Sequence, residues 1–134
     1  MALTMLQKIR RAETAVREMP QVELETKHYF AGGMYAREVF RPEGTFIVGK
    51  VHKREHFYIV TKGSVQVATE DGIRIYEAPC VVVSKPGTKR AVLALEDSVC
   101  MTVHRTDNTD LEEIEKELIE EDQKALYDAG NLLK

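Results

Sequence analysis

Residues Val65–Ile75 read VQVATEDGIRI, and this stretch decides the fold class. Apolar and polar residues alternate on both sides of Asp71-Gly72, and a period of two is typical of a strand with one buried face. The Asp-Gly pair favours the tight turn of a β-hairpin, because both central residues of that turn need positive φ. We therefore predict two antiparallel strands that are joined at Asp71-Gly72.

Similar short segments fill the chain from about residue 28 to residue 104. They are rich in β-branched residues, and turn residues such as Lys62-Gly63 and Pro86-Gly87 separate them. Ala31-Gly32-Gly33 is expected to be a bend before the first strand of the barrel. About eight closely spaced strands favour an antiparallel sandwich or barrel. The predicted strands are Tyr35–Phe40, Thr45–Val51, His56–Thr61, Ser64–Thr69, Ile73–Glu77, Cys80–Ser84, Arg90–Ala94 and Ser98–His104.

The N-terminal segment is predicted to be a helix from Thr4 to Met19. Apolar residues recur there at spacings of three and four, Thr4 and Gln7 fit a capping box, and Pro20 ends the pattern. At 134 residues the chain has the length of one domain. We predict a single domain over residues 1–134, with a helix and lead-in (1–27), a barrel (28–104) and a C-terminal helical segment (105–134).

The C-terminal segment repeats the helical signals. Thr109 and Glu112 fit a second capping box, and Gly130 is a suitable stop. The sequence leaves open whether the two helices pack on the barrel or between subunits. The apolar stripe of the C-terminal segment consists of Leu111, Ile114, Leu118 and Leu126.

Charge and composition exclude several classes of protein. The formal net charge is −3; residues 107–134 hold ten acidic and three basic residues, a net of −7, so the rest of the chain carries +4. The chain has no tryptophan and no long apolar stretch, and its two cysteines fit buried thiols better than a disulfide scaffold. We expect no nucleic-acid polymer and no membrane as partner, and with no secretory signal visible we expect a cytoplasmic protein.

Histidines mark the first candidate site. His52 and His56 lie at facing ends of neighbouring predicted strands, and His104 lies near the end of the last one. Imidazole is a common ligand for zinc, iron, copper and nickel, but such sites need three or more protein ligands. His104, His28 or a carboxylate would have to complete the set.

Two segments resemble the two motifs of the cupin superfamily. They are GKVHKREH (Gly49–His56), followed by Gly63, and SKPGTKR (Ser84–Arg90). The resemblance implies a small jelly-roll barrel that often holds a metal ion on three histidines and one glutamate inside its mouth. When the segments are aligned on Gly63, the ligand positions fall on Lys50, His52, His56 and Arg90, so two of the four are cations.

Most of the chain is also similar to small cupin-like proteins of tailed bacteriophages and prophages. The similar stretches include His28–Glu38, Val83–Arg90 and Val103-His104 together with the helix that follows. This similarity implies a protein of the bacterial host cytoplasm. One role open to such a protein is the sequestration of a host signalling nucleotide.

The same residues fit an anion-binding pocket better than a metal centre. Arg90 and Lys50 would supply the positive charge, because an arginine fork and a lysine point charge both suit phosphate or carboxylate. His52 and His56 could donate or accept hydrogen bonds, His104 lies within reach, and Tyr58 would form an aromatic wall. Lys85 and Lys89 lie on loops near the rim. The alternative is that Lys50 and Arg90 pair with carboxylates and only hold the barrel together.

We therefore predict a non-enzymatic, cupin-like binding protein for a small anionic ligand, without a cofactor and assembled as a homo-oligomer. One alternative is a metal-dependent enzyme, an oxygenase or isomerase, with the metal ion on His52, His56 and His104. The other is a structural or assembly protein of a phage particle, in which the helices mediate the contacts.

Overall fold

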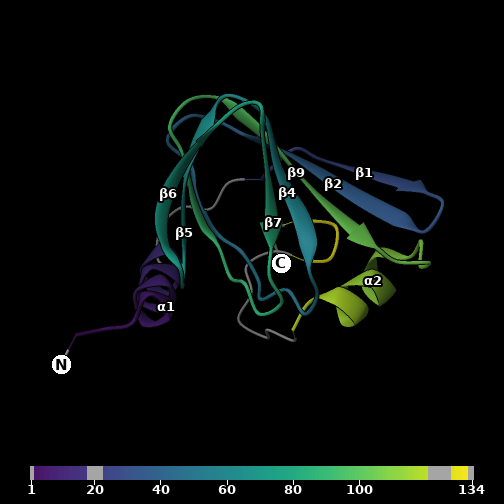
Figure 1. Ribbon diagram of the computed structural model, residues 1–134, viewed down its shortest axis with the longest axis horizontal. Coiled ribbons are helices and arrows are strands. Elements are labelled where there is room, and N and C mark those ends of the chain that lie inside the picture. Colours follow the sequence, from purple (N-terminus) through teal and green to yellow (C-terminus); the bar gives the residue numbers. More distant parts are fainter. Residues whose placement is uncertain (1, 18–22, 121–127, 133–134) are drawn as a thin grey trace.

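The computed structural model describes residues 2–17, 23–120 and 128–132. Its strands form two antiparallel sheets that face each other as a jelly-roll barrel (Figure 1). The four-stranded sheet has the order β3 (Phe46–Val48), β8 (Ala91–Ala94), β5 (Ser64–Thr69) and β6 (Gly72–Glu77). The five-stranded sheet has the order β1 (Thr26–Ala31), β2 (Met34–Arg41), β9 (Ser98–Arg105), β4 (His56–Lys62) and β7 (Cys80–Ser84).

The mainly β fold with two helices confirms the predicted class. β5 and β6 pair from Ser64↔Glu77 to Thr69↔Gly72, so the predicted hairpin is present, but its turn lies one residue earlier than predicted, at Glu70-Asp71. The five-stranded sheet, however, begins one strand earlier than expected. β1 precedes Gly32 and Gly33, whose positive φ values of 48° and 81° close a hairpin between β1 and β2 instead of bending the chain before the first strand.

The core fills the space between the two sheets. Inward-facing side chains of both sheets form its main cluster, because residues of one face alternate along each strand. A second, smaller cluster joins the lead-in to β1 with β2 and β3 through Leu24, Val39 and Ile47. The main cluster consists of Tyr58, Val60, Val65, Val67, Val92 and Cys100.

Gly63 fixes the tight turn between β4 and β5. Its φ is +78°, and a Cβ atom there would lie 2.3 Å from Ser98 Oγ and 2.5 Å from the carbonyl oxygen of Asp97. Only glycine combines this backbone conformation with such a close approach. The glycine on which the two sequence motifs were aligned is thus required by packing.

Helix α1 (Met5–Val16) begins as predicted. The Gln7 backbone N–H donates to Thr4 Oγ1 (3.1 Å) and the Thr4 N–H donates to Gln7 Oε1 (2.9 Å), which is the expected capping box. Ile9 is buried, and the helix lies outside the barrel beside β3 and β5 (Figure 1). Met19 and Pro20 lie outside the described residues.

Helix α2 (Leu111–Leu118) departs from the prediction at both ends. Its N-cap is Asp110 and not Thr109, because Asp110 Oδ1 accepts the N–H groups of Glu112 (2.9 Å) and Glu113 (3.2 Å). It ends at Leu118, after which Ile119 is extended, so Gly130 does not terminate it. Leu126 lies outside the described residues. No helix in the described ranges is long and apolar enough to span a bilayer.

Both helices lie on the barrel and not apart from it. Ile114 and Leu118 of α2 pack against Tyr35 of β2, with Ile119 completing the cluster. The end of α2 and the residues that follow it are hydrogen-bonded to the segment after β3. The Lys53 N–H donates to the Leu118 carbonyl (2.7 Å), and the Glu120 N–H donates to the Val51 carbonyl (2.9 Å). α2 therefore covers the end of the barrel where the predicted site residues gather.

Candidate functional site

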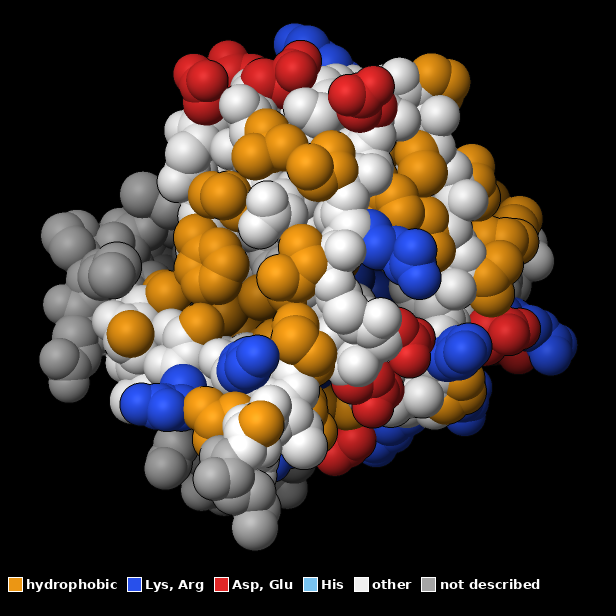
Figure 2. Space-filling model, turned by 60° about the vertical axis from the view of Figure 1, so that its left-hand side comes forward, with side chains coloured by type: hydrophobic (Ala, Val, Ile, Leu, Met, Phe, Trp, Pro, Cys, Tyr) orange, Lys and Arg blue, Asp and Glu red, His pale blue; other side chains and the backbone are white. Residues whose placement is uncertain are grey.

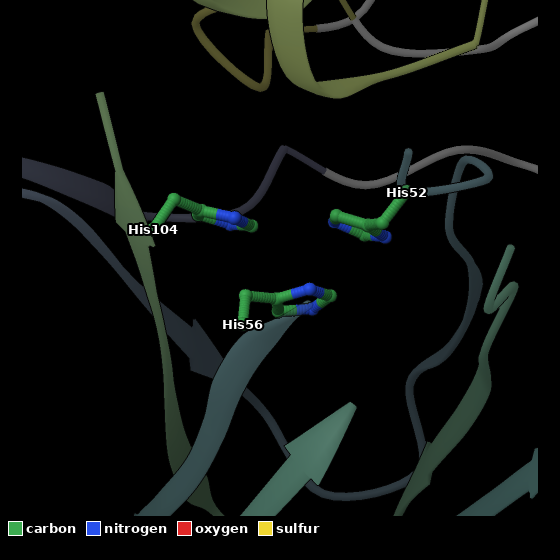
Figure 3. A group of neighbouring side chains, drawn as sticks. All are labelled: His52, His56 and His104. Carbon is green, nitrogen blue, oxygen red and sulfur yellow. The ribbon is translucent and has the colours of Figure 1, made fainter. Parts of the chain in front are cut away.

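Three histidines from separate segments converge at this end of the barrel (Figure 3). His56 begins β4, His104 lies near the end of β9, and the pair Phe57↔Val103 places the two side by side. The prediction that His52 and His56 end neighbouring strands is wrong, because β3 ends at Val48 and belongs to the other sheet. His52 lies on the segment between β3 and β4, where its N–H donates to the Thr88 carbonyl (3.0 Å). Their ring centroids are 4.3 to 5.5 Å apart, and one ligand nitrogen of each lies within 4.8 Å of the others.

Burial keeps these three imidazoles neutral at pH 7. It lowers the pKa of His104 to about 3, with the positive charge that a protonated His56 would carry as the next cause. Burial also lowers the pKa of His56 to about 4, although the Arg54 carbonyl partly opposes the shift. The pKa of His52 is held well below its usual value by burial and then by the charge of Arg90. Neutral imidazoles are the form that binds a metal ion or accepts a hydrogen bond.

Arg90 directly contacts the cluster. Its Nη1 donates to His56 Nε2 (3.1 Å) and to Ser84 Oγ (3.0 Å), and its guanidinium carbon lies 4.4 Å from the centre of the Tyr58 ring. His56 Nδ1 lies 3.0 Å from the Arg54 carbonyl oxygen. Because a carbonyl only accepts, Nδ1 carries the proton and Nε2 is the acceptor for Arg90. Burial lowers the pKa of Arg90 to about 10, so the side chain stays charged at neutral pH.

Beside the cluster lies a cavity of about 110 Å³. Its wall combines apolar side chains such as Val39 and Val92 with several cations, which come from β2, from the end of β3 and from the start of β8. Concave, partly apolar spaces with a few polar groups are where small ligands bind. The cationic lining residues are Arg37, Arg41, Lys50 and Arg90.

Several buried polar atoms around this cavity lack a partner among the described residues. They are Arg41 Nε and Nη1, the Tyr58 hydroxyl and His52 Nδ1. Burying a polar atom without a hydrogen bond costs free energy, and for a charged donor the cost is larger. The low polarity around the Tyr58 hydroxyl has a second effect, because burial raises the pKa of this group. A set of orphaned groups on one cavity wall is typical of a ligand site.

The carboxylates of the cavity wall are engaged elsewhere. Glu13 of α1 lies 3.1 Å from Lys89 Nζ and 3.5 Å from Arg17. Asp128 Oδ1 accepts the N–H groups of Gly130 (3.0 Å) and Leu132 (2.9 Å). Among the described residues, neither carboxylate accepts a hydrogen bond from Arg41 Nε or Nη1.

The predicted site residues separate into four places. Lys50, His52, Tyr58 and Arg90 line the cavity, and Lys50 forms an ion pair with Glu115 of α2. His56 and His104 lie in the histidine cluster behind it. Lys89 is buried and paired with Glu13.

Lys85 belongs to a second groove, of about 420 Å³, between the edge strands β6 and β7. Arg74 and Thr88 also line it, and Arg90 and Tyr58 lie between the two spaces because they line both. Figure 2 faces this side of the molecule, where basic side chains lie in a hollow between patches of hydrophobic ones.

Sequence reasoning missed Arg37 and Arg41. Arg37 Nε donates to the Tyr35 hydroxyl (3.0 Å), which also lies 2.6 Å from His28 Nδ1. The available signal was the alternation of β2, in which Tyr35, Arg37, Val39 and Arg41 share one face. Two arginines on the same face as buried Tyr35 and Val39 indicate an inward-facing charge.

Known structures share this architecture, although no protein-family model matches the chain and no curated protein matches it in sequence. KdgF from a Halomonas species matches at a TM-score of 0.58 and 18% identity, over 70% of this chain and 90% of that one. A cupin superfamily protein from Desulfitobacterium hafniense matches at 0.56 and 9%, over 67% and 84%. An RmlC-like cupin from Shewanella frigidimarina matches at 0.57 and 15%, over 69% and 85%.

The fold is a cupin barrel. At these identities the likeness extends to the fold alone. Within this cupin barrel, the motif-based alignment put Lys50, His52, His56 and Arg90 at one site. The structure brings three of them, His52, His56 and Arg90, together with His104, whereas the Lys50 ammonium pairs with Glu115.

Proposed function

We propose that the barrel cavity binds a small anionic ligand through a carboxylate or phosphate group, and that the protein is a binding protein and not an enzyme. The observation that carries the proposal is the half-buried Arg41, whose Nε and Nη1 atoms are buried and have no hydrogen-bond partner among the described residues. Arginine offers two parallel donors to such groups, and a hydrogen bond to a charged group contributes about 1.5–3 kcal/mol. An anion would therefore stabilise this wall of the cavity.

The cavity volume supports a compact ligand. Pockets for drug-sized ligands measure about 300–1,000 Å³, so a cavity of about 110 Å³ suits a smaller group. A signalling nucleotide would have to extend out of the cavity, with only its phosphate near Arg41. Sequestration of a nucleotide, a phage origin and a cytoplasmic location stay predictions that rest on the sequence resemblance.

Calorimetric titration tests the proposal. Inorganic phosphate, acetate and a cyclic nucleotide are titrated into the wild-type chain and into Arg41→Met. We expect heat with at least one probe and a loss of affinity of about tenfold or more in the variant, because a charged donor is removed. Arg105→Met, which removes an exposed arginine at the end of β9, is the matched control and should bind like the wild type. Absence of heat with every probe, or equal affinity in Arg41→Met, contradicts the proposal.

A metal centre on His52, His56 and His104 is the second candidate. The observation that favours it is the placement of three neutral imidazoles with ligand nitrogens within 4.8 Å of one another. Three protein ligands are enough for a catalytic metal ion, which supplies a Lewis acid or an activated water. His52 Nδ1, buried and unpartnered, fits a ligand role, whereas His56 Nε2 is already bonded to Arg90.

A further inference from the structure

We infer that Arg90 excludes divalent metal ions from the histidine cluster by occupying the one nitrogen of His56 that could bind them. The inference concerns a competition inside the cluster, and it goes beyond the anion-binding role because it does not depend on any ligand in the cavity.

His56 has only one nitrogen to offer. Its Nδ1 carries a proton and donates to the Arg54 carbonyl oxygen at 3.0 Å. The remaining lone pair, on Nε2, accepts the Arg90 Nη1–H at 3.1 Å. One lone pair serves either a proton donor or a metal ion. Metal binding by all three histidines and the Arg90–His56 hydrogen bond are therefore mutually exclusive.

Arg90 is held in this position from several sides. The same Nη1 donates to Ser84 Oγ at 3.0 Å, the guanidinium stacks on Tyr58 at 4.4 Å, and the residue is only 7% exposed. A metal ion would have to displace the guanidinium from these contacts. If it did not, two cations would face each other in a buried site, where charge repulsion is poorly screened.

The cluster itself is otherwise suited to a metal ion. His52 and His104 supply the other two imidazoles, and one ring nitrogen of each of the three histidines lies within 4.8 Å of the others. Ligand nitrogens of a tetrahedral zinc site lie roughly 3.3 Å apart at zinc–nitrogen distances of about 2.0–2.1 Å. A small closing movement of the imidazoles would bring them to that spacing. The guanidinium of Arg90 is thus the feature that separates this cluster from a metal site.

Metal titration of the variant Arg90→Met tests the inference, with Co²⁺ and Zn²⁺ as probes. Methionine removes the charge and the donor but keeps an unbranched side chain. We expect Co²⁺ to bind the variant at least about tenfold more tightly than it binds the wild type, with absorption bands of a Co²⁺–imidazole complex. The double variant Arg90→Met/His52→Ala should lose the gain. Equal affinity of wild type and Arg90→Met overturns the inference.

Arg74→Met is the matched control for loss of a positive charge. Arg74 lines the groove that reaches Arg90, but it is exposed on β6. We expect its Co²⁺ affinity to equal that of the wild type; a gain as large as that of Arg90→Met would assign the effect to net charge and overturn the inference.

Nitrogen-15 NMR of the wild-type histidines keeps the test valid if Arg90→Met does not fold. We expect His56 to show a protonated Nδ1 and a hydrogen-bonded Nε2, both unchanged when an equimolar amount of Zn²⁺ is added. A Zn²⁺-induced shift of His56 Nε2 overturns the inference. Failure of the anion titrations would leave these results unaffected, so the two proposals fail independently.

Discussion

Their place in the fold changes the chemistry of His56 and His104. Burial lowers their pKa values to about 4 and about 3, whereas 6.5 is the ordinary value for an exposed histidine. At pH values between the folded pKa and 6.5, these histidines bind protons in the unfolded chain but not in the folded chain. The contribution of each residue to stability is therefore complete above pH 6.5 and is lost as the pH falls toward the folded pKa.

We predict that acidification from pH 7 to pH 5 destabilises the protein more than its carboxylates explain. Each of His56 and His104 should reduce the free energy of unfolding by about 2 kcal/mol at pH 5. Urea denaturation at several pH values measures the slope. His104→Gln, which cannot titrate, should show a shallower slope; a free energy that is flat over this range, or an equal slope in the variant, contradicts the prediction.

At the scale of the elements, helix α2 positions the charges around the cavity. Glu115 pairs with Lys50, Glu117 lies 3.3 Å from Arg54, and Lys53 Nζ donates to the Lys116 carbonyl (2.8 Å). Sequence patterns indicated that this helix exists, because its apolar stripe is local. They placed the cap one residue early, since Thr109 and Asp110 are both good N-cap residues and only the path of the chain after β9 selects between them.

We predict that Asp110→Ala reduces the free energy of unfolding by about 1 kcal/mol, while Thr109→Ala changes it little. Asp110 accepts hydrogen bonds from two backbone N–H groups at the start of α2, and its negative charge interacts favourably with the positive end of the helix dipole. Equilibrium denaturation of the two variants against the wild type measures the difference. A larger loss in Thr109→Ala would show that the cap lies at the residue first indicated by the sequence.

At the scale of the whole molecule, the outer face of the five-stranded sheet is apolar beside its edge strand β7. Val81 and Val83 are 63% and 54% exposed, and Val83 pairs with Phe57 of β4, which is 48% exposed. Contiguous exposed apolar side chains are typical of a contact surface. This patch of Val81, Val83 and Phe57 is where the predicted homo-oligomer would gain most from association.

We predict that a second copy of the chain covers this patch. Light scattering on a sizing column should give a mass above that of one 15.2 kDa chain, and Val83→Lys should reduce it, because a charge on an edge strand opposes pairing. Ile75→Lys, on the exposed face of β6 in the other sheet, is the control and should leave the mass unchanged. A monomeric wild type contradicts the prediction.

The sequence by itself indicated most of the strands and turns and the three histidines that could bind a metal ion. It extended the strand of β3 to Val51, whereas β3 ends at Val48. Alternation and turn chemistry act over a few residues, so the hairpin around Asp71 can be inferred without knowledge of the rest of the chain. The exception is β1, whose side chains are mostly exposed and whose pattern is therefore weak.

Only the tertiary structure decided which charged groups meet. Lys50 pairs with Glu115, 65 residues away, and no sequence pattern indicated this contact. Arg90 bonds to His56, 34 residues away; the motif alignment placed both at one site but could not show that they bond to each other. Burial completed the site: it made the imidazoles neutral and left Nε and Nη1 of Arg41 without a partner among the described residues. Desolvation depends on what packs around a group and not on its neighbours in the chain.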